Sequence, residues 1–299
     1  MIKVSVVINT LNEERNIKRA INSVLWADEI IVCDMYSDDK TVHIAKSLGI
    51  KVVYHKRMGY VEPARNFAIS KTSGEWVLIL DADEEIPRSL VLEIKRLLSK
   101  PIVSDFVEIP RKNIIFGSWM MASGWWPDYN IRLFKKGAVS WTNNIHRPPE
   151  TKGQGIKLDA SEKFAIIHNH YQTISQFLIR MDRYTTIQAR ELIKNGYKFR
   201  WGDLLEKPIG EFLSRFFALR GFEDGVHGLA LSILQGFSHF VLYLKVWEEE
   251  KFAIKEIEWR DLSELKIKLS SEINYWFNQK NLSQNKFKNF FQKIQKKLS

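Results

Sequence analysis

The sequence predicts an α/β protein with a doubly wound, mostly parallel sheet and a helical C-terminal extension. Two observations lead to this fold class. Within the first hundred residues, short apolar runs alternate with segments whose apolar residues recur at helical spacing, as in βαβ units with right-handed crossovers. From Thr173 onward, the apolar residues keep helical spacing alone. A sheet-forming part is therefore followed by a helical part.

Each predicted strand is short, apolar and bounded by polar residues or glycine. The run Trp76–Leu80, which follows Gly74, is too short for a helix and has the composition of a strand buried on both faces. Helical segments follow the strands, and the second of them stops at Gly49. The four expected strands are Ile2–Ile8, Glu29–Cys33, Lys51–Tyr54 and Trp76–Leu80.

Polar residues gather where three of these strands end, which is the edge at which open α/β sheets bind ligands. Asp81 and Asp83 can both bind one divalent cation, or one of them can bind the cation while the other binds a hydroxyl of the ligand. The alternative is an acidic helix start near Pro87. No glycine-rich phosphate loop follows the first strand, so a nucleotide would be held by side chains and metal. The residues at this edge are Thr10, Asn12, Glu13, Asp34, Ser37, Asp81 and Asp83.

Composition and charge limit the partners and the compartment. The formal charge of +10 and the pI near 9.4 indicate an anionic partner: nucleic acid, anionic lipid or a phosphorylated substrate. Cys33 is the single cysteine, so there is no disulfide framework and a reducing compartment is favoured. The first apolar run is shorter than that of a secretory signal. We therefore expect a cytoplasmic protein.

Seven segments, taken together, resemble the family 2 glycosyltransferases of GT-A fold. Within that family, the chain is similar to the branch that contains lipopolysaccharide-core β-1,4-glucosyltransferases. The resemblance extends over roughly residues 2 to 250. The segments are Val6–Glu14, Ile31–Thr41, Arg65–Ala68, Trp76–Glu84, Trp126–Phe134, His168–Tyr171 and Phe216–Phe222.

The resemblance implies inverting transfer of a hexose from a nucleoside-diphosphate sugar, UDP-glucose or similar, to a cell-envelope glycan or glycolipid such as lipopolysaccharide core. It implies that Asp83, within a D-x-D motif, and His168 hold Mg²⁺ or Mn²⁺. It also implies a nucleotide-sugar-binding half (1–100), an acceptor-binding half of the same domain (101–172), a helical, membrane-proximal region (173–254) and a basic amphipathic tail (255–299). The implied nucleotide-sugar contacts are Thr10, Asn12, Glu13, Asp34, Ser37, Arg65, Asn66 and Asp81.

Asp128 is the candidate catalytic base, because it matches the aspartate of the family's Trp-x-Pro-Asp segment. It stands among Trp125, Trp126 and Tyr129, and such apolar surroundings would raise its pKa. The alternative is a surface-loop aspartate. Arg132 either helps to hold a phosphate or an acceptor acid, or is a surface arginine of a strand.

The C-terminal region is expected to lie on an anionic membrane surface. Gly225–Trp247 is apolar but interrupted by polar residues, which favours a helix at the membrane surface or one packed in the protein core. Lys266–Ser299 carries eight lysines and one glutamate, with an apolar helical face that includes Phe287 and Phe290. These features favour a peripheral protein on the inner face of the cell membrane, with no nucleic-acid partner. The alternative function is a non-catalytic nucleotide- or RNA-binding module with a basic tail.

Overall fold

The computed structural model describes residues 2–57, 61–99, 104–142 and 148–278. The chain forms two compact units. The first comprises Met1–Ile115 and Trp126–His170, and the second comprises Phe116–Trp125 and Tyr171–Ser299.

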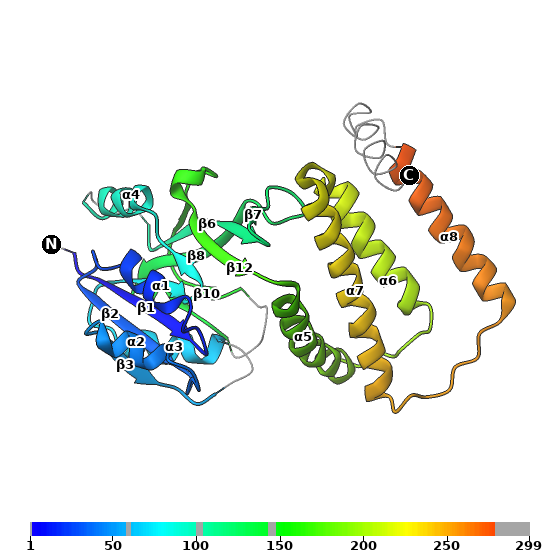
Figure 1. The fold of residues 1–299 in the computed structure, drawn as a ribbon, viewed down its shortest axis with the longest axis horizontal. Coiled ribbons are helices and arrows are strands. Elements are labelled where there is room, and N and C mark those ends of the chain that lie inside the picture. Colours follow the sequence, from blue (N-terminus) through cyan, green and yellow to red (C-terminus); the bar gives the residue numbers. More distant parts are fainter. Residues whose placement is uncertain (1, 58–60, 100–103, 143–147, 279–299) are drawn as a thin grey trace. The chain divides into compact units, whose positions relative to one another are not determined.

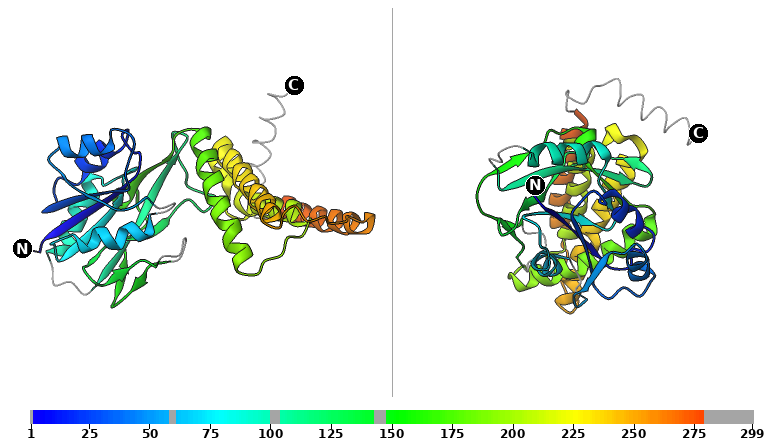
Figure 2. Two further views of the ribbon diagram at one scale, coloured as in Figure 1. Left: turned by 90° about the horizontal axis from the view of Figure 1, so that it is seen from below. Right: turned by 90° about the vertical axis from the view of Figure 1, so that its left-hand side faces the viewer.

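The first unit is built on one mixed sheet with the strand order β3-β2-β1-β4-β8-β6-β12-β5. Strands β1 to β4 pair in parallel, whereas β8 runs antiparallel to β4 and to β6, and β12 antiparallel to β5. The parallel strands and their helices form the blue to cyan part of the chain (Figure 1; Figure 2). The strands are β1 (Val4–Thr10), β2 (Glu29–Asp34), β3 (Lys51–Tyr54), β4 (Trp76–Asp81), β5 (Glu84–Glu85), β6 (Phe106–Ile115), β8 (Asp128–Lys135) and β12 (Ile166–Tyr171). Shorter strands are β7 (Ser118–Trp119), β9 (Val139–Ser140), β10 (Glu150–Thr151) and β11 (Gly155–Lys157).

Helices cover both faces of the parallel strands, so residues on both faces of β1 and β4 are buried. Every residue of β1 is buried, and so are the first five residues of β4. One core cluster joins alternate residues of β1 and β4 to α1 (Ile17–Ser23), α2 (Thr41–Ser47) and α4 (Arg88–Leu98). A second cluster joins the opposite faces of these strands to α3 (Glu62–Ser70). The predicted fold class is thereby confirmed, with an antiparallel second half that completes the sheet.

The second unit is helical. Helix α7 (Gly225–Glu249) packs against α5 (Ile174–Lys194) and α6 (Asp203–Leu213), and these helices lie side by side in both figures. Gly228 lets α7 pack closely against the backbone of Gly221, since a Cβ at position 228 would lie 1.8 Å from the Gly221 carbonyl oxygen. A final helix, α8 (Trp259–Asn278), packs on α6, and short helical turns of this unit are η2 (Ser214–Ala218) and η3 (Gly221–Asp224). The turn η1 (Glu162–Phe164) belongs to the first unit. The predicted helical extension is confirmed.

The segment Gly221–Glu249 is long and apolar enough to cross a membrane, judged by length and composition alone. The apolar window within it has a mean hydropathy of 1.4, and 33% of that window is buried by the protein itself. Its placement at a membrane surface remains a prediction. The most lysine-rich part of the tail, residues 279–299, lies outside the described residues.

Candidate active site

The strand ends that the sequence marked as polar are neighbours in the sheet. In the register of the parallel strands, Thr10 of β1 pairs with Asp34 of β2, and Asn9 pairs with Asp81 of β4. Because parallel strands end at the same edge, the polar loops that follow them converge there. All the residues discussed below as site residues belong to the first unit.

The loops after β1 and β2 are bonded to each other. The hydroxyl of Ser37 accepts a hydrogen bond from the backbone nitrogen of Asn12 (2.8 Å) and donates one to the Asp34 carboxylate (2.5 Å). The backbone nitrogen of Glu13 donates to Thr41. Thr10 is 2% exposed, and its hydroxyl oxygen is buried without a hydrogen-bond partner in the described structure. Four of the predicted nucleotide contacts thus lie together, with Thr10 ending the strand beneath them.

Asp81 is held between two arginines. Its carboxylate lies 2.8 Å from the guanidinium of Arg132 and 3.1 Å from that of Arg65. Burial alone would raise the pKa of Asp81, but the charges of Arg132 and Arg65 outweigh it and hold that pKa well below its usual range. Asp81 is therefore ionised at neutral pH.

The neighbouring residues of the α3 segment are divided between two tasks. Arg65 reaches Asp81, and its guanidinium also lies 5.5 Å from the ring centre of Trp141. Asn66 instead braces the backbone of Trp141: its amide donates to the Trp141 carbonyl (2.7 Å) and accepts from the Trp141 nitrogen (2.9 Å). The structure does not bring the Asn66 side chain into the network around Asp81, and its role in nucleotide binding remains a prediction.

Arg132 is a buried residue, so of the two alternatives for it, that of a surface arginine is wrong. Its side chain is 3% exposed and lies 2.6 Å from the fully buried Glu84 carboxylate, in addition to its contact with Asp81. Glu84 also lies 3.3 Å from Arg111 of β6. A buried cation requires such anionic partners, because its desolvation costs roughly several kcal/mol that nothing else offsets.

The pKa of Asp128 is lowered, not raised as its apolar neighbours in the sequence suggested. Burial by itself would raise this pKa, but the charge of Arg111 and hydrogen bonds from Asn113, Arg111 and Asn130 outweigh it. Arg111 forms two of these bonds with Oδ2, at 2.8 and 2.6 Å. The deciding charge comes from a neighbouring strand, because Arg111 and Asp128 are paired between β6 and β8.

Asn113 connects Asp128 to His168. The amide nitrogen of Asn113 donates to Oδ2 of Asp128 (3.1 Å), and its amide oxygen lies 2.6 Å from Nδ1 of His168. An ionised carboxylate only accepts hydrogen bonds, so it fixes which end of the amide faces it. The amide oxygen then requires a proton on Nδ1 of His168, which leaves the lone pair of Nε2 available as a ligand.

His168 is one of three neighbouring side chains that could bind a metal ion. Asp83, His168 and His170 each offer one atom, and these atoms lie within 4.8 Å of one another. Nε2 of His168 is 3.5 Å from the Asp83 carboxylate and 3.2 Å from Nδ1 of His170. Pairing of β5 with β12 creates this cluster, since His168 stands opposite Glu84 and the backbone nitrogen of Asn169 donates to the Asp83 carbonyl. One carboxylate and two imidazoles form a donor set that suits a divalent cation.

Comparison with known proteins shows the family of the chain. The family model described as glycosyl transferase family 2 matches residues 5–152. An uncharacterized glycosyltransferase of Rickettsia typhi, RT0209, is 35% identical over 257 residues, which cover 83% of this chain and 88% of that protein. The chain belongs to glycosyltransferase family 2.

Two further similarities extend the comparison of this glycosyltransferase. The lipopolysaccharide core biosynthesis glycosyltransferase LpsC of Rhizobium meliloti is 24% identical over 77% of this chain and 89% of that protein. A crystal structure of glucosyl-3-phosphoglycerate synthase from Mycobacterium tuberculosis, with Mn²⁺, UDP and glucosyl-3-phosphoglycerate, is 30% identical with a TM-score of 0.32. That match covers 36% of this chain and less than half, 43%, of the synthase.

Several residues of the candidate site, among them His170 and Asn113, were not among those predicted from the sequence. His170 could have been found from the strand period of two, which places it on the same face as His168. Asn113 could not, because its link to Asp128 and His168 depends on pairings between strands distant in the chain. Of the predicted aromatic neighbours of Asp128, Tyr129 is committed elsewhere, with its hydroxyl donating to the Leu158 carbonyl at 2.7 Å. Trp125 belongs to the second unit.

Proposed function

We propose that this glycosyltransferase moves a hexose from a UDP-linked donor, such as UDP-glucose, to a glycan or glycolipid of the cell envelope, with inversion at the anomeric carbon. The observation that supports it best is the continuous line from Asp128 through Asn113 to the cluster of Asp83, His168 and His170. The proposed proton acceptor and the proposed cation-binding residues are thereby joined by hydrogen bonds through Asn113. The name of LpsC, a relative at 24% identity, supports an envelope acceptor such as lipopolysaccharide core.

The donor would occupy the edge formed by β2, β1 and β4. The unpartnered hydroxyl oxygen of Thr10 and the buried Nε of Arg65 are polar groups that a nucleotide can satisfy. In this proposal the residues 1–100 bind the nucleotide-sugar and 101–172 bind the acceptor. The nucleotide-sugar contacts would be Thr10, Asn12, Glu13, Asp34, Ser37, Arg65, Asn66 and Asp81.

Asp83, His168 and His170 would hold the divalent cation, because their ligand atoms converge and Asn113 orients the His168 ring. When bound, the cation neutralises charge that develops on the leaving diphosphate. Mg²⁺ prefers oxygen ligands alone, whereas imidazole suits transition metals, so two histidines favour Mn²⁺ over Mg²⁺. We expect Mn²⁺ to restore more activity than Mg²⁺ after treatment with EDTA.

Asp128 would accept the proton of the attacking hydroxyl. In this step the acceptor oxygen bonds to the anomeric carbon, the bond from that carbon to the diphosphate breaks, and the electron pair leaves with the diphosphate. Oδ2 of Asp128 is occupied by Arg111 and Asn113, whereas Oδ1 accepts one side-chain hydrogen bond, from Asn130 at 3.1 Å. The proton therefore goes to Oδ1. The lowered pKa keeps Asp128 ionised, and hence able to act as a base, throughout the neutral range.

The assay is release of UDP from candidate donors in the presence and absence of envelope glycolipid. We expect Asp128→Asn to lower turnover by about 100-fold or more, the usual contribution of an acid–base group. We expect Asp83→Ala to lower turnover as well, because it removes the carboxylate ligand of the proposed cation. Asp159→Asn, the same charge loss at an exposed residue outside the network, is the control and should retain activity. Wild-type turnover in Asp83→Ala or Asp128→Asn would remove the assigned roles, and no release from any sugar donor would remove the proposed activity.

The same enzyme would work on the inner face of the cell membrane, as a cytoplasmic, peripheral protein. Support comes from exposed apolar side chains beside the lysines of the C-terminal region: Trp259 is 84% exposed and Ile267 is 70% exposed. The test is flotation with vesicles that contain phosphatidylglycerol, for the whole chain and for a variant without residues 266–299. Weaker flotation of the shortened chain is expected, and equal flotation would exclude an anchoring role for the tail.

A further inference from the structure

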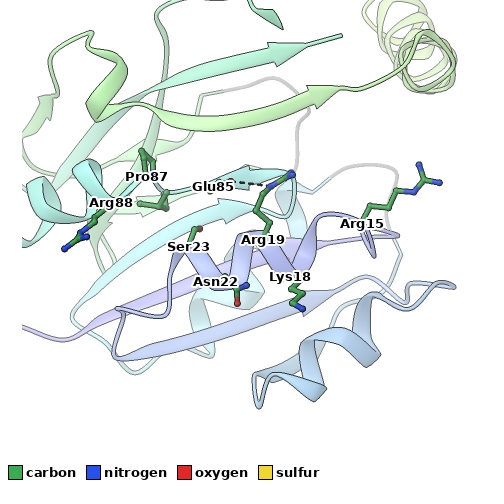
Figure 3. A pocket seen from close by; sticks show the side chains of 9 residues that line it. Arg15, Lys18, Arg19, Asn22, Ser23, Glu85, Pro87 and Arg88 are labelled. Atoms are coloured by element: carbon green, nitrogen blue, oxygen red, sulfur yellow. Dashed lines mark ion pairs between the residues drawn. The ribbon is translucent and has the colours of Figure 1, made fainter. Parts of the chain in front are cut away.

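A hollow in the first unit is lined by residues that are not assigned to transfer. It has a volume of about 520 Å³ and is formed by the segment of α1 and by the segment that leads from β5 into α4. Figure 3 shows Arg15 and Arg88 at opposite ends, with Arg19 and Glu85 between them. We call it the α1–α4 pocket. Its lining residues are Arg15, Lys18, Arg19, Asn22, Ser23, Glu85, Ile86, Pro87 and Arg88.

The α1–α4 pocket is strongly basic, with four cationic side chains and one carboxylate in its lining. The carboxylate, Glu85, is already paired with Arg19 at 3.5 Å. Arg15, Lys18 and Arg88 are exposed, and none of them has an ion-pair partner within the part of the chain that the structure describes. Three cations from two separate segments thus line one hollow, and none of them is neutralised by an ion pair within the described residues.

The lining selects the kind of ligand. A divalent cation is disfavoured, because the single carboxylate is paired and four positive charges surround it. An apolar molecule is disfavoured too, since Ile86 and Pro87 are the apolar members of the lining. Guanidinium and ammonium groups spaced along one hollow on two segments suit phosphate oxygens, which accept charge-assisted hydrogen bonds. We propose that the α1–α4 pocket binds a phosphate group, carried by a soluble phosphate ester or by the headgroup of an anionic phospholipid.

The pocket is distinct from the transfer site but adjoins it in two places. Glu85 lines the pocket while the preceding residue, Glu84, contacts Arg132 in the buried network, and consecutive strand residues point to opposite faces. Arg19 also donates to the Asn16 side chain (2.9 Å), whose amide donates to Glu13 (2.7 Å) in the loop after β1. A phosphate held by Arg19 would therefore lie two hydrogen bonds from that loop.

The experiment measures phosphate binding directly, so it does not depend on the proposed transfer. Inorganic pyrophosphate is titrated calorimetrically into the full chain in EDTA, which removes any contribution from a metal-bound site. In a parallel arm, the chain is mixed with vesicles of phosphatidylcholine with and without phosphatidylglycerol. The variant is Arg15→Gln, Lys18→Gln, Arg88→Gln. The control removes three exposed lysines elsewhere in the same unit: Lys3→Gln, Lys51→Gln, Lys152→Gln.

The pocket variant is expected to bind at least tenfold more weakly than the control variant in one arm or in both. Loss in the pyrophosphate arm identifies a soluble phosphate ester as the ligand class, and loss confined to phosphatidylglycerol vesicles identifies the lipid headgroup. Equal binding by the two variants in both arms, or no binding by the wild-type chain in either, would overturn the proposal and leave the pocket as a solvated basic face. Circular dichroism verifies that both variants are folded.

Discussion

Replacement of Asn113 by alanine tests the link between the proposed base and the proposed cation site. Asn113 is fully buried and makes the 2.6 Å contact that fixes the proton of His168 on Nδ1. Without it, the ring is free to rotate or to place the proton on Nε2, the atom that faces Asp83. Loss of a hydrogen-bond partner of a metal-binding histidine commonly weakens metal affinity by about 10- to 100-fold. We therefore expect the Kd for Mn²⁺ to rise by about that factor.

The assay is titration of Mn²⁺ followed by electron paramagnetic resonance of the free ion, which is independent of catalysis. Asn130→Ala is the matched control, because Asn130 donates to Oδ1 of Asp128 and makes no hydrogen bond to His168 in the described part of the chain. Asn113→Asp separates the two contacts: the new carboxylate still accepts the Nδ1 proton of His168, but it can no longer donate to Asp128. That variant should keep Mn²⁺ affinity and lose turnover. Unchanged affinity in Asn113→Ala, or equal losses in Asn113→Ala and Asn130→Ala, would refute the reasoning.

Three further predictions concern stability and reactivity. Arg132→Met removes one of the two arginine partners of the half-buried Asp81 and of the fully buried Glu84. It should lower the free energy of unfolding by about 3–5 kcal/mol in urea titrations, whereas disruption of an exposed ion pair costs at most about 1 kcal/mol. The pKa of Asp81 is lower in the folded chain than in the unfolded chain, where it is about 4. Asp81 therefore contributes its full stabilisation above about pH 4 and loses it as the pH falls through the folded pKa. Urea midpoints should drop below about pH 4, and they should drop less steeply in Asp81→Asn. Burial raises the pKa of Cys33 to about 12, so Ellman's reagent should label it only upon unfolding, and rapid labelling of the native chain would contradict its burial.

Local sequence signals were sufficient to predict the parallel half of the sheet. The apolar runs of β1 and β4 are buried on both faces, as their composition requires, and polar residues follow wherever such a strand leaves the core. Adjacency of Thr10, Asp34 and Asp81 then follows from parallel pairing of neighbouring strands. These features depend on periodicity and chain order, which a single sequence contains.

The electrostatic character of the site depends on contacts that periodicity does not encode. Tryptophan and tyrosine next to Asp128 in the sequence suggested a raised pKa, but Arg111 reaches it from the neighbouring strand and reverses the shift. Arg132 was expected at the surface or on a ligand, and its burial beside Glu84 follows from the central place of β8 in the sheet. Charges brought together by antiparallel pairing of distant segments decide both outcomes.

Glu84 fixes the conformation of the turn that carries Asp81 and Asp83. One of its carboxylate oxygens accepts the backbone N–H of Asp81 at 2.9 Å, while the other is held by Arg132 at 2.6 Å. The turn is thus closed by its own last side chain, and an inserted or deleted residue within it would displace both aspartates together. Variation in donor preference among related enzymes should consequently accumulate in the surrounding loops, while the length of this turn stays constant.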